Sequence, residues 1–191
     1  MGNANNEERF RKSSLQDQMI LDFPVASATL IAKGDFVLLW AGSAIQPDDL
    51  GSSYNSLAAA QRDAARLFAG MALDESAAGS TAKIRVDVSP TAIYECDQET
   101  AGAVSIGDYF SIHAESAAGT GFALSNQELG PITCSWAIMQ CVAEKTSTTS
   151  TKVLCKMVQN RFYNQAHHEG LTTISWPNDT CNVESDPSYA G

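Results

Sequence analysis

The stretch from Phe68 to Val88 constrains the fold more than any other, because it contains two strand patterns joined by a short turn of small residues. In its second half, apolar residues alternate with charged ones. The apolar set is Ile84, Val86 and Val88, and the charged set is Lys83, Arg85 and Asp87. A period of two predicts a strand with one buried face and one face in water. The first half is mostly apolar and predicts a more deeply buried strand.

Similar short patterns predict strands elsewhere in the chain, at 29–32, 36–40, 91–96, 109–114, 136–142 and 152–158. The run 36–40 is too apolar to have an exposed face, so we expect it at the centre of the core. The segments 41–53 and 119–134 are rich in Gly, Ser and Pro and are predicted to be loops. Regular short strands with few helices favour a mainly β fold, a small antiparallel barrel or sandwich.

One short α-helix is predicted near residues 55–67, with Asn55 or Ser56 as its N-cap. Its apolar residues recur every three or four positions. They are Leu57, Ala60, Ala64 and Leu67. An alanine-rich face can approach a sheet or a second helix closely. Two interpretations stay open, namely packing on the chain's own core and a contact between subunits.

A length of 191 residues suits one domain with appendages. We expect an N-terminal arm over 1–28, a β-barrel domain over 29–158 and a C-terminal tail over 159–191. The arm is polar, and alone it would not offset its ordering entropy, so it is either mobile or laid against a neighbour. Its expected anchor is the apolar cluster Met19–Phe23.

The charge balance excludes several classes of partner. The net charge is −10 and the pI is about 4.6. Binding a phosphate backbone requires clustered Lys and Arg, so we expect neither direct nucleic-acid binding nor attraction to an anionic membrane. The first residues lack the apolar core of a secretory signal, which favours synthesis in the cytoplasm and reduced cysteines.

The residues capable of chemistry do not form a recognisable motif. The five cysteines contain no CxxC pair, and Cys96, Cys141 and Cys155 lie in expected strands as small apolar residues. His113 alternates with apolar neighbours and is expected to point into solvent, while His167 and His168 lie in the tail. We therefore expect no catalytic, metal or cofactor site. An enzyme with Cys134 or Cys181 as nucleophile remains an alternative.

Several short motifs resemble the head decoration proteins of tailed bacteriophages. They are Gly70–Gly79, with the sequence Gly-Met-Ala-Leu-Asp-Glu-Ser-Ala-Ala-Gly, then Lys83–Val86, and then Val104–Phe110 with Gly107-Asp108. In that family an aliphatic strand leads into an acidic, alanine-rich turn ending in Gly, followed by an alternating strand and a later Gly-Asp turn.

This resemblance implies a small β-barrel of the β-tulip kind that binds the outside of an assembled capsid. It also implies a homotrimer that contacts the major capsid protein, cements neighbouring capsomers and is not an enzyme. In our hypothesis, residues of the arm and the helix contact the capsid or a neighbouring subunit. They are Phe10, Met19, Ile20, Leu21, Phe23, Leu57, Ala60 and Ala64. A tail-tube, neck or fibre protein of a virion is the alternative, because such proteins also use small β-barrels with arms.

Overall fold

The computed structural model describes residues 19–50, 54, 56–116, 122–132 and 136–162. The described chain is mainly β with one α-helix, which confirms the predicted fold class. The first half contains β1 (Ile20–Pro24), β2 (Phe36–Trp40), β3 (Ser43–Ile45), the 3-10 helix η1 (Pro47–Leu50), α1 (Leu57–Leu67), β4 (Phe68–Ala72) and β5 (Lys83–Asp87). The second half contains β6 (Ile93–Gln98), β7 (Tyr109–Ser116), β8 (Phe122–Pro131), β9 (Met139–Cys141) and β10 (Lys152–Met157).

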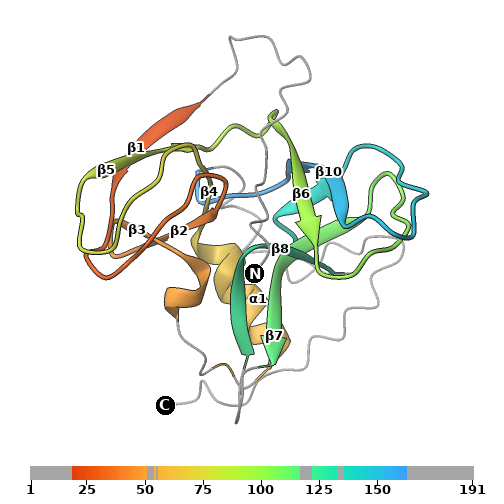
Figure 1. Ribbon diagram of the computed structural model, residues 1–191, viewed down its shortest axis with the longest axis horizontal. Coiled ribbons are helices and arrows are strands. Elements are labelled where there is room, and N and C mark those ends of the chain that lie inside the picture. Colours follow the sequence, from red (N-terminus) through yellow and green to blue (C-terminus); the bar gives the residue numbers. More distant parts are fainter. Residues whose placement is uncertain (1–18, 51–53, 55, 117–121, 133–135, 163–191) are drawn as a thin grey trace, which may run out of the picture.

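The first half forms an antiparallel sheet with the order β1-β5-β4-β2-β3. Val25, just after β1, bridges Ala44 in β3, so the two ends of the sheet meet and the sheet curls on itself (Figure 1). We call it the curled sheet. It encloses an apolar set, the sheet cluster, made of Val25, Ile31, Val37, Leu39, Ala44, Ala69, Ala72, Ile84, Val86 and Val88.

The second half forms a closed barrel with the order β10-β6-β8-β7-β9, which returns to β10. The pairs are antiparallel except β6–β8, which is parallel. The closure is narrow, because β6 pairs with β8 at two positions and β7 pairs with β9 at two positions, whereas β7 and β8 pair along most of their length.

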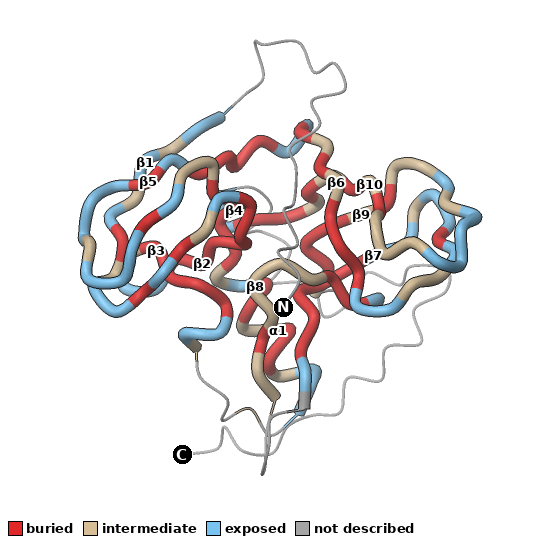
Figure 2. The backbone as a smooth tube through the Cα atoms, in the orientation of Figure 1, coloured by how far each residue is buried: buried red, intermediate tan, exposed pale blue. Residues whose placement is uncertain are grey.

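One hydrophobic core joins the two halves. Phe36 and Leu38 of β2 point away from the sheet cluster and pack in a second set, the central cluster, which includes buried residues of α1 and of the barrel. The intervening Val37 and Leu39 face the sheet cluster. Residues 36–39 are thus covered on both faces, as the sequence predicted, but Trp40 at the end of the strand is 58% exposed, which the prediction of a strand without an exposed face did not foresee. Figure 2 shows buried backbone through the middle of the molecule and exposed residues at the outer turns.

The residues after β10 fasten the barrel to the curled sheet. The backbone N–H of Arg161 donates to the Phe68 carbonyl at 2.7 Å, and its Nη1 donates to the Leu39 carbonyl at 3.0 Å. Asn160 Nδ2 donates to the Val88 carbonyl at 2.9 Å. The ring of Phe162 stacks on that of Phe23, with centroids 5.7 Å apart. Residues 160–162, which the sequence assigned to the tail, therefore contact the sheet and the chain beside it.

Several predicted boundaries were wrong. The segment 119–134 was expected to be a loop but contains β8, and 41–53 contains β3 and η1. The expected strand 29–32 is reduced to one bridge between Ile31 and Ser76. The sheet begins at Ile20, inside the expected arm.

Asp87 was expected in water but is fully buried. It shares the face of Lys83 and Arg85, yet it lies opposite the buried Met71 of the neighbouring strand. Its Oδ1 accepts from the backbone N–H of Ser89 at 2.9 Å. The alternation of the strand alone does not predict burial at this position.

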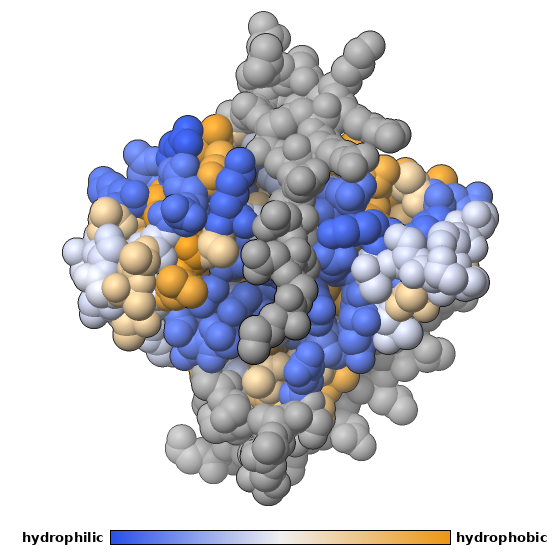
Figure 3. Space-filling model, in the orientation of Figure 1, coloured by the Kyte–Doolittle hydropathy of each residue, from blue (hydrophilic) through white to orange (hydrophobic). Residues whose placement is uncertain are grey.

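The exterior is polar on the face shown in Figure 3, where hydrophilic side chains lie over both halves and hydrophobic ones form small separate patches. Within the described residues, no helix has both the length and the apolar character needed to cross a bilayer.

Candidate functional site

Some of the residues expected to contact the capsid or a neighbouring subunit are exposed, and others are covered by the rest of the chain. Met19 and Ile20 are 36% and 40% exposed at the start of β1. Leu21 and Phe23, on the other face of that strand, are half-buried against the sheet cluster. Phe10 lies outside the described residues. The alternation of β1 thus leaves Ile20 on its exposed face, and Met19, which precedes the strand, is exposed as well.

The helix contributes one accessible residue of the three expected there. Ser56 caps α1 by accepting from the backbone N–H of Ala59 at 3.2 Å, and Leu57 is 41% exposed. Ala60 and Ala64 have no exposed surface and belong to the central cluster. These two alanines allow close packing of α1 inside the molecule, so they do not offer a surface to another subunit.

The barrel contains a polar site that the sequence did not predict. His113 was expected in solvent but is buried, with an exposed fraction of 8%. The register of β7 against β8 shifts between Ile112 and Ala114, so His113 lies at a bulge. A bulge turns a side chain away from the direction that strict alternation gives. His113 Nδ1 lies 3.2 Å from Oε2 of Glu99.

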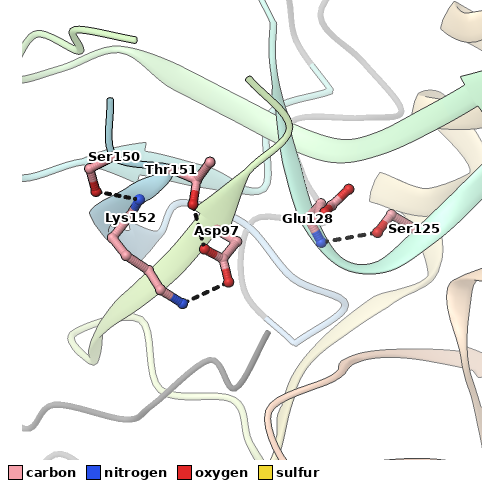
Figure 4. A network of polar contacts seen from close by, with 6 residues as sticks. All are labelled: Asp97, Ser125, Glu128, Ser150, Thr151 and Lys152. Atoms are coloured by element: carbon pink, nitrogen blue, oxygen red, sulfur yellow. Dashed lines mark hydrogen bonds and ion pairs between the residues drawn. The ribbon is translucent and has the colours of Figure 1, made fainter. Parts of the chain in front are cut away.

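The partner strand is also irregular at this point. Ser125 Oγ accepts from the backbone N–H groups of Gln127 and Glu128, at 3.4 and 3.1 Å, and this turn interrupts the pairing of β8. Figure 4 shows Ser125 and Glu128 together on β8. His113, Glu115 and Glu128 each offer one potential ligand atom, and these atoms lie within 4.8 Å of one another. Among the described residues, these three form the group whose spacing could hold a metal ion. Glu115 is exposed and Glu128 is half-buried.

The same irregular segment lines a polar cleft of about 390 Å³ between the barrel and the curled sheet. Its lining is Ala32, Asp35, Gln46, Glu115, Ser125, Asn126, Gln127 and Glu128. Across the cleft, the backbone N–H of Asp48 donates to Asn126 Oδ1 at 3.1 Å. The interruption of β8 therefore supplies the contacts that join the two halves on this side.

Asp35 is the buried carboxylate of this cleft. Its Oδ2 accepts from the Ala32 backbone N–H at 2.7 Å and from Gln46 Nε2 at 2.6 Å, and its Oδ1 accepts from Gln127 Nε2. Burial raises the pKa of Asp35 above its usual range, although these hydrogen bonds act to lower it. The carboxylate is held in place by both halves of the molecule.

A second cluster of polar side chains, at β6 and the start of β10, holds these two strands together. Lys152 Nζ donates to Asp97 Oδ2 at 2.7 Å, and Thr151 Oγ1 donates to Asp97 Oδ1 at 3.0 Å (Figure 4). These contacts tie the start of β10 to the end of β6. The carboxylate of Asp97 is thereby occupied by two donors.

The described cysteines are buried thiols, as expected from their places in strands. Burial raises the pKa of Cys96 to about 12 and raises that of Cys155 further. A thiol with a raised pKa is a poor nucleophile near neutral pH. Cys134 and Cys181, the two candidates for catalysis, lie outside the described residues.

An apolar groove of about 660 Å³ lies beside the last residues of η1. Its lining includes Trp40, Leu50, Tyr54 and Leu67, with Asp49, Asp63 and Arg66 at its polar positions. Trp40 is 58% exposed and is the most exposed aromatic residue among those described.

Sequence reasoning missed Asp35, Glu99, Glu115 and Glu128 as a group because they come from four separate segments. The available signal was the run Ser125–Glu128, four polar residues between the apolar Phe122–Leu124 and Leu129. Such a run within an apolar pattern is typical of a bulge beside a site.

Comparisons with known proteins identify no relative of this chain: no family model matches it, and no curated protein and no solved structure matches it.

Proposed function

We propose that this chain is a structural, non-catalytic protein of a virion that binds the outer surface of an assembled capsid. In this proposal it contacts the major capsid protein, forms a homotrimer and cements neighbouring capsomers. The proposal rests on the motifs in 70–110 that resemble phage head decoration proteins, and on one structural observation. That observation is that β1, within the described part of the chain, pairs with only one strand along Ile20–Pro24, and the bridge that closes the sheet begins at the next residue, Val25.

β1 pairs with β5 along Ile20–Pro24 and, among the described residues, has no other strand partner along that range. The backbone groups on the outer side of such a strand can pair with a strand from another protein. Ile20, in the same strand, adds exposed apolar surface. In the sequence, β1 is preceded by the segment that was predicted to form most of the N-terminal arm.

The structure alters how the arm must be tested. Deleting residues 2–23 would remove most of β1 and open the sheet cluster, because Leu21 and Phe23 pack there. The informative deletion is therefore 2–18, which leaves the sheet intact. We expect this deletion to abolish binding to undecorated expanded capsids of the virus that encodes the chain, while circular dichroism and thermal unfolding remain those of the full chain.

A point variant tests the edge itself. Ile20→Lys places a charge in the proposed contact, and we expect at least a tenfold loss of bound copies in a pelleting assay. Ile106→Lys is the matched control, because Ile106 is 67% exposed on a turn of the barrel. Saturable binding by the control and the full chain, with increased heat resistance of the particles, would support a cement role.

Full capsid occupancy by the 2–18 deletion or by Ile20→Lys would contradict the proposed edge. Failure of the full chain to bind capsids, with rings or fibres forming in its own solution, would favour the tail-tube, neck or fibre alternative. Native mass spectrometry of the free protein tests the homotrimer directly.

A further inference from the structure

We propose that His113, Glu115 and Glu128 bind one divalent transition-metal ion, of which Zn²⁺ is the representative, and that this ion fastens β7 to the interrupted part of β8. The site is independent of capsid binding. It uses residues for which the proposed virion role has no need.

The three side chains already converge. One ligand atom from each lies within 4.8 Å of the others. Ligands at about 2.1 Å around a tetrahedral ion are separated by roughly 3.4 Å. The required contraction is small and falls on Glu115, which is exposed, and on Glu128, which is half-buried. Side-chain rotation in these two residues can provide it.

The buried imidazole is the fixed ligand of this group. The bulge at His113 turns the ring inward, and Glu99 Oε2 lies 3.2 Å from Nδ1. An imidazole that keeps its proton on Nδ1, facing a carboxylate, leaves the lone pair of Nε2 for a cation. A carboxylate behind a histidine ligand is a common arrangement in metal sites because it orients the ring.

The backbone at the site also favours a cation. The Ser125 turn places Glu128 where β8 leaves its regular pairing with β7, so a shared ion would connect the two strands where their pairing is interrupted. Three carboxylates, Glu99, Glu115 and Glu128, surround one imidazole, and a dication reduces their mutual repulsion. Glu115 and Glu128 also line the polar cleft, from which water can complete the coordination.

The donor set selects the class of metal. One imidazole nitrogen with two carboxylates suits Zn²⁺ and its transition-metal neighbours. Ca²⁺ prefers six to eight oxygen ligands, and Mg²⁺ prefers several retained waters. We therefore expect Zn²⁺ to bind much more tightly than either ion.

The test is calorimetric titration of the full-length, metal-free protein with Zn²⁺, together with thermal unfolding. We expect saturable binding of one ion at this site and a higher Tm with Zn²⁺, because an ion that binds only the folded state stabilises it. His113→Gln and Glu128→Gln should each weaken this binding at least tenfold and remove the rise in Tm. Circular dichroism without metal establishes that each variant is folded, and Glu128→Gln retains the size of a half-buried side chain.

Two controls separate this site from adventitious binding. Replacing His167 and His168 together by Ala should leave the binding unchanged, and so should Glu144→Gln on a distant turn. The proposal is overturned if Zn²⁺ does not bind saturably, or if binding survives both His113→Gln and Glu128→Gln. It is also overturned if the His167/His168 double variant abolishes the binding.

Discussion

At Asp35, folding places a carboxylate inside the protein between two distant parts of the chain. Gln46 and the Ala32 backbone donate from its own half, and Gln127 donates from the barrel. Loss of water raises the pKa of Asp35, and the three hydrogen bonds only partly offset this effect. The residue therefore joins the halves while making the folded state sensitive to pH.

The sign of this sensitivity follows from the raised pKa. The folded protein binds the Asp35 proton more tightly than the unfolded chain does, whose carboxyl has the ordinary pKa of 3.8. The corresponding stabilisation is complete below that pH and is lost as pH rises through the folded-state pKa. An asparagine side chain does not titrate, so Asp35→Asn does not lose stability in this way as pH rises. The Gln127 amide can flip, exchanging its oxygen and nitrogen, so that its oxygen accepts from the amide nitrogen of the new side chain.

We therefore expect the free energy of unfolding of Asp35→Asn, relative to the original protein, to improve as pH rises from about 4 to 7. Urea unfolding of both proteins across this range measures the difference. A difference that does not change with pH, or that changes in the opposite direction, would contradict the prediction.

Among the elements, β4 and β5 approach each other unusually closely. A Cβ added to Gly70 would lie 2.0 Å from the carbonyl oxygen of Asp87 and 2.9 Å from its carbonyl carbon. Both atoms are backbone, so no side-chain rotation can relieve the overlap. The glycine thus allows the close contact of two strands, and it lies beside the extra residue Ala69, where the register of β2 against β4 shifts.

Gly70→Ala should lower the free energy of unfolding by about 1–3 kcal/mol or more, because the strands must separate to admit the methyl group. Gly102→Ala is the matched control, since its nearest neighbour would be Gln98 Nε2 at 3.8 Å. We expect the control to change stability by less than about 1 kcal/mol. Chemical unfolding measures both, and equal effects of the two substitutions would argue against the steric explanation.

Local patterns predicted the elements that depend on local signals. The alternation of Lys83–Asp87, the apolar run Phe36–Trp40 and the cap at Ser56 all correspond to observed elements. β8 was missed because the Ser125 turn interrupts its pattern and because Gly130 and Pro131 at its end are loop signals. The same interruption concealed the polar group around His113, whose burial depends on a bulge in the neighbouring strand. Tertiary pairing, which a local pattern does not contain, decided both.

For the molecule as a whole, the central cluster joins the curled sheet, α1 and the barrel into one hydrophobic core. Phe36, Ala64 and Leu129 belong to the three parts and are fully buried in the same cluster. The hydrogen bonds of Asn160 and Arg161 add polar contacts between the residues after β10 and the sheet. Neither half can lose its fold without exposing apolar surface of the other.

We therefore expect Leu129→Ala, at the barrel end of this core, to cost about 2–5 kcal/mol and to destabilise both halves equally. Two backgrounds that retain a single tryptophan, Trp40 in β2 or Trp136 beside α1, report the unfolding of each half by fluorescence. Both midpoints should shift together in urea. A shift confined to the Trp136 background would show that the halves unfold separately.

The stacked rings of Phe23 and Phe162 have a topological consequence. They place the last described residue against the first strand, so the folded path of the chain is nearly a closed loop. The packing of the described residues therefore does not require the chain to be open between residues 162 and 19. A circular permutant that joins residues 19 and 162 by a flexible linker, and opens the chain at the exposed turn around Ser147, should keep both cores and leave the outer edge of β1 accessible.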